Sequence, residues 1–184
     1  MLIASLHQGI SDLMPSRLEF YENWLNPIGM RDGKIGLAPL AAVLSFLRQE
    51  GEPYTLVTSR AGEYAAQWTF DDLSPIKRSF IRALPVMMRA RMAMRLAKTV
   101  VRGSYDGSHA VAKLRHGQGT FALRSSIFCA VREPFDWPLC VFYSAALAHL
   151  FALVGVTGEV RVHSCQGVGD PGCVIAVSVP PDQN

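Results

Sequence analysis

The sequence predicts an α+β fold in which an antiparallel β-sheet is flanked by helices. Three observations lead to this prediction. Apolar residues recur at helical spacing through much of the first hundred positions, a period of two begins after residue 108, and the order hairpin, helix, hairpin follows. The length of 184 residues suits a single domain spanning 1–184, with an N-terminal helical part at 1–58 and a core at 105–180.

Five helices are expected before the first strand, from the spacing of apolar residues and the turn residues between them. Their ranges are 16–25, 38–51, 59–70, 71–85 and 85–103. Gly51 is a typical C-terminal stop, while Ser74 and Pro75 form an N-cap and first-turn pair. Residues 30–36 are expected to form a loop.

The helix at 85–103 has two distinct sides when its residues are placed on a helical wheel. The basic side contains Arg91, Arg95, Lys98 and Arg102. The other side contains Met88, Met92 and Leu96. Because methionine adapts to irregular shapes, these apolar side chains can line a ligand pocket, and they can equally be plain core.

Charge along this part of the chain has one sign. Eight basic residues and no acidic residue occur from Lys77 to Arg102, although the net charge of the chain is only +3. The basic side is either a solvated face or a rim that attracts carboxylates, phosphates or an anionic membrane surface. Nucleic acid is not expected as a partner, because no aromatic residues interleave with the charges on the helix at 85–103 and the total charge is low.

The second half of the chain predicts two hairpins around one helix. The expected strands are 109–117, 120–131, 158–165 and 173–179. Asp136 and Pro138 are expected at the start of the helix between them, and Gly155 at its end. Its apolar stretch of 18 residues contains histidine, serine and proline, so a buried helix is favoured over a membrane span.

The cysteines offer a metal site. Strand alternation puts His163 and Cys165 on one face, with Cys173 opposite Cys165 across the hairpin. Cys140 lies in the first turn of the preceding helix, where the macrodipole lowers the pKa of a thiol. If this helix packs near the loop, Cys140, Cys165 and Cys173 converge, with His163 as fourth ligand of a zinc ion.

Other interpretations of the cysteines stay open. They can be reduced core residues, or Cys165 and Cys173 can form a disulfide. Cys129 falls in the middle of a predicted strand and is interpreted as a small core residue. A catalytic Cys140 lacks an evident acidic orienter or oxyanion feature. The N-terminus shows no secretory signal, so a cytoplasmic location is expected, which favours thiols or metal ligands over disulfides.

Three segments form a recognisable C-terminal outline, namely LRSSIFCAV, PLCVFYSAALAHLFALVG and VRVHSCQGVGDPGCVIAVSV. Together they resemble the 4-vinyl reductase domain, also called the hydrocarbon-binding domain. The matching positions are Cys140, Cys165, Gly167, Gly169 and Cys173. Upstream, AGEYAAQW and the long segment from LSPIKRSF to VVRGSY are similar in order to the bacteriochlorophyll-type 4-vinyl reductase proteins.

The resemblance implies an α+β fold related to vesicle-tethering (TRAPP) subunits, commonly a homodimer. It implies hydrophobic ligands, which are aromatic hydrocarbons in sensor relatives and tetrapyrroles in the pigment branch. The cysteines carry zinc in sensor relatives, which also have a glutamate three residues before the first hairpin cysteine. Here that position is Val162. A basic rim would suit the propionate groups of a tetrapyrrole.

Three functions follow as hypotheses. The first is a binding protein for a hydrophobic small molecule such as a tetrapyrrole, acting in delivery, sensing or as an accessory factor in pigment synthesis. Its ligand-binding residues would be Met88, Met92, Leu96, Arg91 and Arg95. The second is a 4-vinyl reductase for divinyl chlorophyllide-type substrates, although the sequence has no nucleotide-cofactor fingerprint. The third is a dimeric scaffold or tethering-type protein with the helix at 85–101 as its seam.

Overall fold

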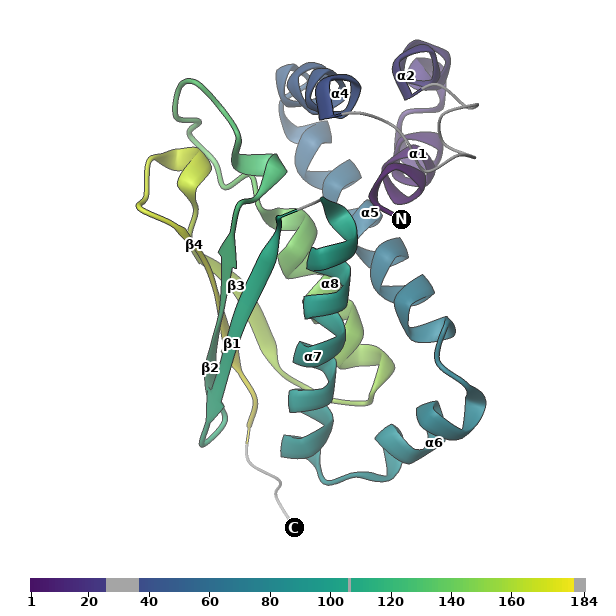
Figure 1. Cartoon of the computed structure of the whole chain (residues 1–184). Coiled ribbons are helices and arrows are strands. Elements are labelled where there is room, and N and C mark those ends of the chain that lie inside the picture. The colour runs from purple at the N-terminus through teal and green to yellow at the C-terminus, as the bar shows by residue number, and fades with distance from the viewer. Residues whose placement is uncertain (26–36, 106, 181–184) are drawn as a thin grey trace.

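One antiparallel sheet with helices against one of its faces forms the framework of the protein (Figure 1). The computed structural model describes residues 1–25, 37–105 and 107–180. The strands are β1 (His109–Arg115), β2 (Gln118–Arg124), β3 (Glu159–Ser164) and β4 (Cys173–Ser178). Their order in the sheet is β1-β2-β4-β3, so β1 and β3 are the edges. This arrangement confirms the predicted α+β class.

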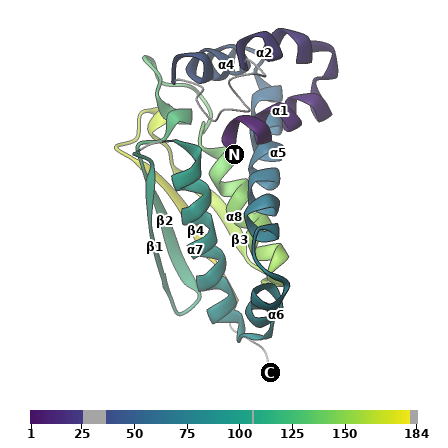
Figure 2. The same cartoon turned by 45° about the vertical axis from the view of Figure 1, so that its right-hand side comes forward.

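The helices gather on one side of the sheet. They are α1 (Leu2–Leu13), α2 (Leu18–Leu25), α4 (Leu37–Gln49), α5 (Glu52–Asp71), α6 (Pro75–Ala83), α7 (Val86–Ser104) and α8 (Val141–Leu153). Helices α7 and α8 lie next to the sheet, α5 lies against α8, and α1, α2 and α4 gather at one end (Figure 2). The opposite face of the sheet carries none of these helices. None of the described helices is long and apolar enough to cross a membrane.

Helix α8 forms the centre of the hydrophobic core. It is apolar on nearly every side because the sheet, α7 and α5 surround it. Phe121 and Ile175, which pair across β2 and β4, belong to the same buried core. A Cβ atom at Gly62 of α5 would collide with the carbonyl oxygen of Phe142. Glycine at this position therefore lets the backbones of α5 and α8 touch.

Several predicted helices are present with shifted boundaries. Ser74 caps α6 as predicted, since its side chain accepts a hydrogen bond from the backbone N–H of Lys77 (3.4 Å). Helix α5 begins at Glu52, earlier than predicted, because Pro53 suits a first turn. Helix α1 lies in a segment for which no helix is predicted. The predicted loop at 30–36 lies outside the described residues.

Two boundaries in the second half are wrong in the sequence-based prediction. Strand β2 ends at Arg124, because Ser125 has a φ of 60° and the chain enters a 3₁₀ turn at Ile127–Cys129. Helix α8 begins at Val141, so Asp136 and Pro138 lie in the preceding loop and do not cap it.

Candidate functional site

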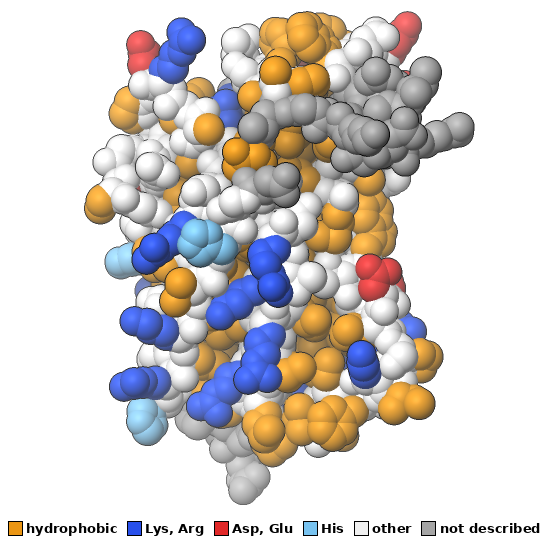
Figure 3. Space-filling view, in the orientation of Figure 1, with side chains coloured by type: hydrophobic (Ala, Val, Ile, Leu, Met, Phe, Trp, Pro, Cys, Tyr) orange, Lys and Arg blue, Asp and Glu red, His pale blue; other side chains and the backbone are white. Residues whose placement is uncertain are grey.

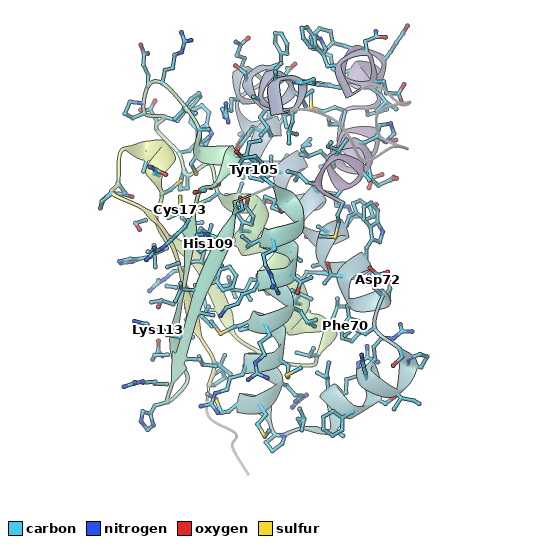
Figure 4. All side chains as sticks on the ribbon, viewed as in Figure 1. Phe70, Asp72, Tyr105, His109, Lys113 and Cys173 are labelled. Carbon is cyan, nitrogen blue, oxygen red and sulfur yellow. The ribbon has the colours of Figure 1, made fainter. Side chains whose placement is uncertain are left out.

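Four cysteines from separate segments meet in the core at one end of the sheet. Cys129 ends the 3₁₀ turn after β2, and Cys140 directly precedes α8. Cys165 directly follows β3, and Cys173, which is labelled in Figure 4, is the first residue of β4. All four side chains are buried, and their Sγ atoms all lie within 4.8 Å of one another. This cysteine cluster is an arrangement that could bind a metal ion.

The distances between the sulfurs suit one ion and exclude a disulfide. Cys129 Sγ lies 3.4 Å from Cys165 Sγ and 3.4 Å from Cys173 Sγ. A disulfide needs about 2.05 Å, and all four cysteines are free. Four sulfurs bound at about 2.3 Å to a tetrahedral zinc ion lie about 3.8 Å from one another. The cluster therefore has the size and the donor chemistry of a zinc site.

Hydrogen bonds from backbone N–H groups hold the loop between β3 and β4, which has Cys165 and Cys173 at its two ends. The carboxylate of Asp170 accepts the backbone N–H of Cys165 (2.7 Å). The N–H of Leu139 donates to Cys165 Sγ (3.3 Å), and the N–H of Gln166 donates to Cys173 Sγ (3.3 Å). Such donors stabilise a sulfur that carries negative charge, as a metal-bound thiolate does.

Two buried side chains from α4 and α5 hold the other two cysteine segments. Arg48 donates to the carbonyl of Phe128 (3.0 Å), just before the first cysteine of the cluster. Tyr54 donates to the carbonyl of Leu139 (2.8 Å), just before the second. Arg48 is 7% exposed and has no ion pair with a described acidic residue. A buried positive charge therefore lies against the backbone of the residue that precedes Cys129.

The pKa values of the thiols in the cluster shift in different directions. Hydrogen bonds from the neighbouring thiols, that of Cys129 first, lower the pKa of Cys165. Hydrogen bonding to the sulfur of Cys129, followed by the other two sulfurs and by burial, raises the pKa of Cys140. The net direction at Cys140 is therefore opposite to the lowering expected from the helix macrodipole. The pKa of Cys173 is lowered too, by hydrogen bonds from Cys129 first, so the thiols of the β3–β4 hairpin are the ones with lowered pKa.

The structure brings together three of the four predicted metal ligands. Cys140, Cys165 and Cys173 lie in the cluster. His163 is exposed on β3 and is not part of it. A β-bulge at 162–164 shifts the register, so Cys165 turns inward although the residues before it alternate as expected. The prediction that Cys165 shares a face with His163 is wrong for this reason.

The fourth sulfur of the cluster comes from Cys129, whose place in the middle of a predicted strand indicates a small core residue. Cys129 is indeed buried. The chain, however, leaves the sheet at Arg124, and the following turn carries the cysteine to the other three. One signal in the sequence points to it, since all four cysteines of the chain fall within residues 129–173.

A second feature is a hollow of about 790 Å³ on the uncovered face of the sheet, at the other end from the cysteines. Two rows of paired residues cross it from β1 to β3. The first row is Lys113, Thr120, Ala176 and Arg161. The second row is Arg115, Gln118, Ser178 and Glu159. In Figure 4, Cys173 lies near one end of the sheet and Lys113 lies further along it toward the other end.

The rows place short side chains on the central strands and long charged ones on the edges. Thr120 and Ala176 form a flat floor, and Lys113 and Arg161 lie on either side of it. At a strand spacing of about 4.8 Å, the two edge strands are about 14 Å apart. Glu159 lies 3.5 Å from Arg161, but both side chains are exposed, so this ion pair is weak. The hollow therefore has a flat floor and a net positive charge.

The predicted ligand-binding residues lie on α7, outside this hollow. They are Met88, Met92, Leu96, Arg91 and Arg95. Met88, Arg91 and Arg95 are exposed, while Met92 and Leu96 are half-buried. The predicted basic edge of the helix is present, and Figure 3 shows its blue side chains along α7. Their role in binding a ligand stays a prediction.

Similarity to known proteins is distant. No protein-family model matches the chain, and no curated protein matches it. Among solved structures, 8 chains match. One is the crystal structure of the phenol-responsive sensory domain of the transcription activator PoxR with phenol. It has a TM-score of 0.45 and 18% identity, and the match covers 79% of this chain and 75% of that chain. What this chain binds has to be inferred from its own residues.

Proposed function

We propose that the protein binds a flat, apolar small molecule that carries carboxylates, and that the hollow on the sheet is the site. The observation that carries this proposal is the row in which Thr120 and Ala176 lie between two cations. A flat ring system can lie on the short side chains while its carboxylates reach Lys113 and Arg161. The volume is within the range of about 300–1,000 Å³ that is typical of small-molecule sites.

Among such molecules, our proposal is a tetrapyrrole. Residues 105–180 resemble the 4-vinyl reductase domain, and tetrapyrroles of the pigment branch are planar macrocycles with propionates on one edge. A ligand lying on the open face would keep its second face accessible to another protein. This supports a role in delivery or sensing, or as an accessory factor in pigment synthesis.

We also propose that the cysteine cluster holds a zinc ion. The support is the sulfur-only donor set, the size of the cluster and the N–H donors to two sulfurs. Bound there, zinc would supply a structural cross-link, since four protein ligands leave no open position for a substrate. The cysteines would then fasten the β3–β4 loop to the end of β2 and the start of α8.

Titration with protoporphyrin IX, followed by its absorbance, tests the ligand proposal. We expect binding that weakens about tenfold in Kd for Lys113→Gln and for Arg161→Gln, because each change removes a charged hydrogen-bond donor. Ala176→Trp should abolish binding by filling the floor of the hollow. Ala122→Trp is the matched control, because Ala122 lies two residues from Thr120 on the same sheet face but outside the hollow.

The basic side of α7 is the competing site. If Arg91→Gln combined with Arg95→Gln weakens binding while Ala176→Trp does not, the ligand lies on α7 and the proposal is overturned. Equal weakening by both tryptophan variants would also contradict it, because the loss would then come from damage to the sheet.

A further inference from the structure

The end of the molecule formed by α6 and the first turn of α7 exposes large apolar side chains. Ile76 is 82% exposed, Phe80 is 64% exposed and Met88 is 47% exposed. Ile76 and Phe80 are four residues apart, so they share one side of α6. Within the described helix α6, Ile81 alone is buried. Figure 3 shows hydrophobic side chains gathered at this end of the molecule.

Hydrogen bonds fix the orientation of these two helices. Arg82 of α6 donates to the carbonyl of Leu153 (3.1 Å) at the end of α8. Arg89 of α7 donates to the carbonyls of Val154 (3.1 Å) and Gly155 (2.7 Å) in the same place. Ile76 and Phe80 lie on one side of α6, and Arg82, which anchors the helix, lies on another side. The apolar surface is therefore presented to solvent by an anchored helix.

Basic residues predominate around this surface, although Asp71 and Asp72 at the end of α5 are acidic neighbours and Asp71 pairs with Arg78 of α6 (3.1 Å). The segment from Lys77 to Arg102 has eight basic residues and no acidic residue. Arg91 and Arg95 are exposed in the first half of α7, and neither forms an ion pair with a described acidic side chain. An apolar surface rimmed by cations is typical of elements that lie in the interface of an anionic membrane.

We propose that α6 and the basic side of α7 form a docking surface for an anionic lipid bilayer. Ile76 and Phe80 enter the boundary between headgroups and acyl chains, and the arginines of α7 lie over the lipid phosphates. The residues differ from those of the hollow, so this proposal and the ligand proposal can each hold without the other.

Two other occupants fit the surface less well. A twofold contact between two copies of the chain would bring the same cations face to face, which is unfavourable. A nucleic acid would pair with the cations but would leave Ile76 and Phe80 in water. An anionic bilayer satisfies the apolar side chains and the cations together.

Flotation of the full chain with lipid vesicles tests the docking surface. Vesicles that contain phosphatidylglycerol should bind the protein, and pure phosphatidylcholine vesicles should bind it far less. The double variant Ile76→Ser, Phe80→Ser should lose more than about tenfold in partition coefficient. Arg91→Gln and Arg95→Gln should each lose about fivefold. Salt at about 1 M, where the Debye length is about 3 Å, should weaken the binding further.

The matched control is Leu56→Ser, because Leu56 is 59% exposed near the far end of α5 from α6. Circular dichroism checks that each variant folds. Absence of binding to anionic vesicles, equal binding to both vesicle types, or an equal loss in Leu56→Ser overturns the proposal. The proposal is also overturned if the protein does not bind vesicles and has a dimeric mass in light scattering that disappears in the Ile76→Ser, Phe80→Ser variant. That result would identify the surface as a contact between copies.

Discussion

Cys129 Sγ lies 3.4 Å from Cys165 Sγ, although 36 residues separate the two in the chain. Strand β4 lies between β2 and β3, so the segments that follow β2 and β3 are not neighbours in the strand order. The cysteine cluster brings them together, as does the hydrogen bond from the backbone N–H of Phe135 to the carbonyl of Gly167 (2.8 Å). Its four cysteine side chains are the ones that a bound metal would require.

The first prediction concerns the fourth ligand. Purified protein should contain about one zinc ion per chain, and Cys129→Ser should remove most of it. The free energy of unfolding should fall by about 4 kcal/mol, because a structural metal contributes to folding directly. Metal analysis by mass spectrometry and thermal unfolding measure the two effects.

His163→Ala is the control for this prediction, since His163 is exposed and outside the cluster. It should leave zinc content and unfolding unchanged. Zinc that is lost on changing His163 but retained on changing Cys129 would show that the metal is held by a different set of ligands.

The second prediction compares two buried tyrosines. Tyr54→Phe removes a hydrogen bond to the carbonyl of Leu139 (2.8 Å) and should destabilise the fold by about 1–3 kcal/mol. The hydroxyl of Tyr143 is buried without a hydrogen-bond partner among the described residues. Tyr143→Phe should therefore change stability by less than about 0.5 kcal/mol, or increase it. Chemical denaturation measures both, and equal losses would contradict the difference in hydrogen bonding.

The third prediction concerns the contact between α5 and α8. Gly62→Ala should destabilise the protein by about 3 kcal/mol, because the new methyl group meets the carbonyl of Phe142 and forces the helices apart. Gly172→Ala is the matched control, because a Cβ atom there meets nothing within 4 Å. Its effect should stay within about 0.5 kcal/mol. Two similar melting temperatures would show that the helices can separate at little cost.

The fourth prediction is a pH dependence. Asp12 of α1 accepts hydrogen bonds from Tyr64 (2.6 Å), Gln8 (2.9 Å) and Arg60 (3.3 Å). These contacts, that of Tyr64 first, lower the pKa of Asp12. Since the folded pKa is below the unfolded value of about 3.9, the contribution to stability is present above that pH and is lost as the pH falls through the folded pKa.

Thermal melts of the wild type and of Asp12→Asn across this range check the prediction. The difference in Tm between them should be largest near neutral pH and should shrink below about pH 4. A difference that stays constant with pH would show that ionised Asp12 contributes nothing particular to the contact between α1 and α5.

The predictable parts of this fold are those governed by local periodicity. The exposed arginines of α7 follow from helical spacing, and the N-cap of α6 at Ser74 follows from local hydrogen bonding. Both hairpins follow from alternation and glycine-containing turns. In each case, residues close in sequence determine the outcome.

The parts that could not be predicted depend on long-range contacts. The inward turn of Cys165 depends on a β-bulge, which strand alternation does not show. The position of Cys129 depends on where β2 ends. The hollow likewise requires the order β1-β2-β4-β3, which places Lys113 and Arg161 on opposite edges.

The same strand order has a consequence during synthesis of the chain. Phe121 of β2 pairs with Ile175 of β4, which the ribosome adds much later. At about 5–20 residues per second, roughly 3–11 s pass between them. During this interval one edge of β2 has its hydrogen-bonding groups unpaired, and the nascent chain is most open to pairing with another chain.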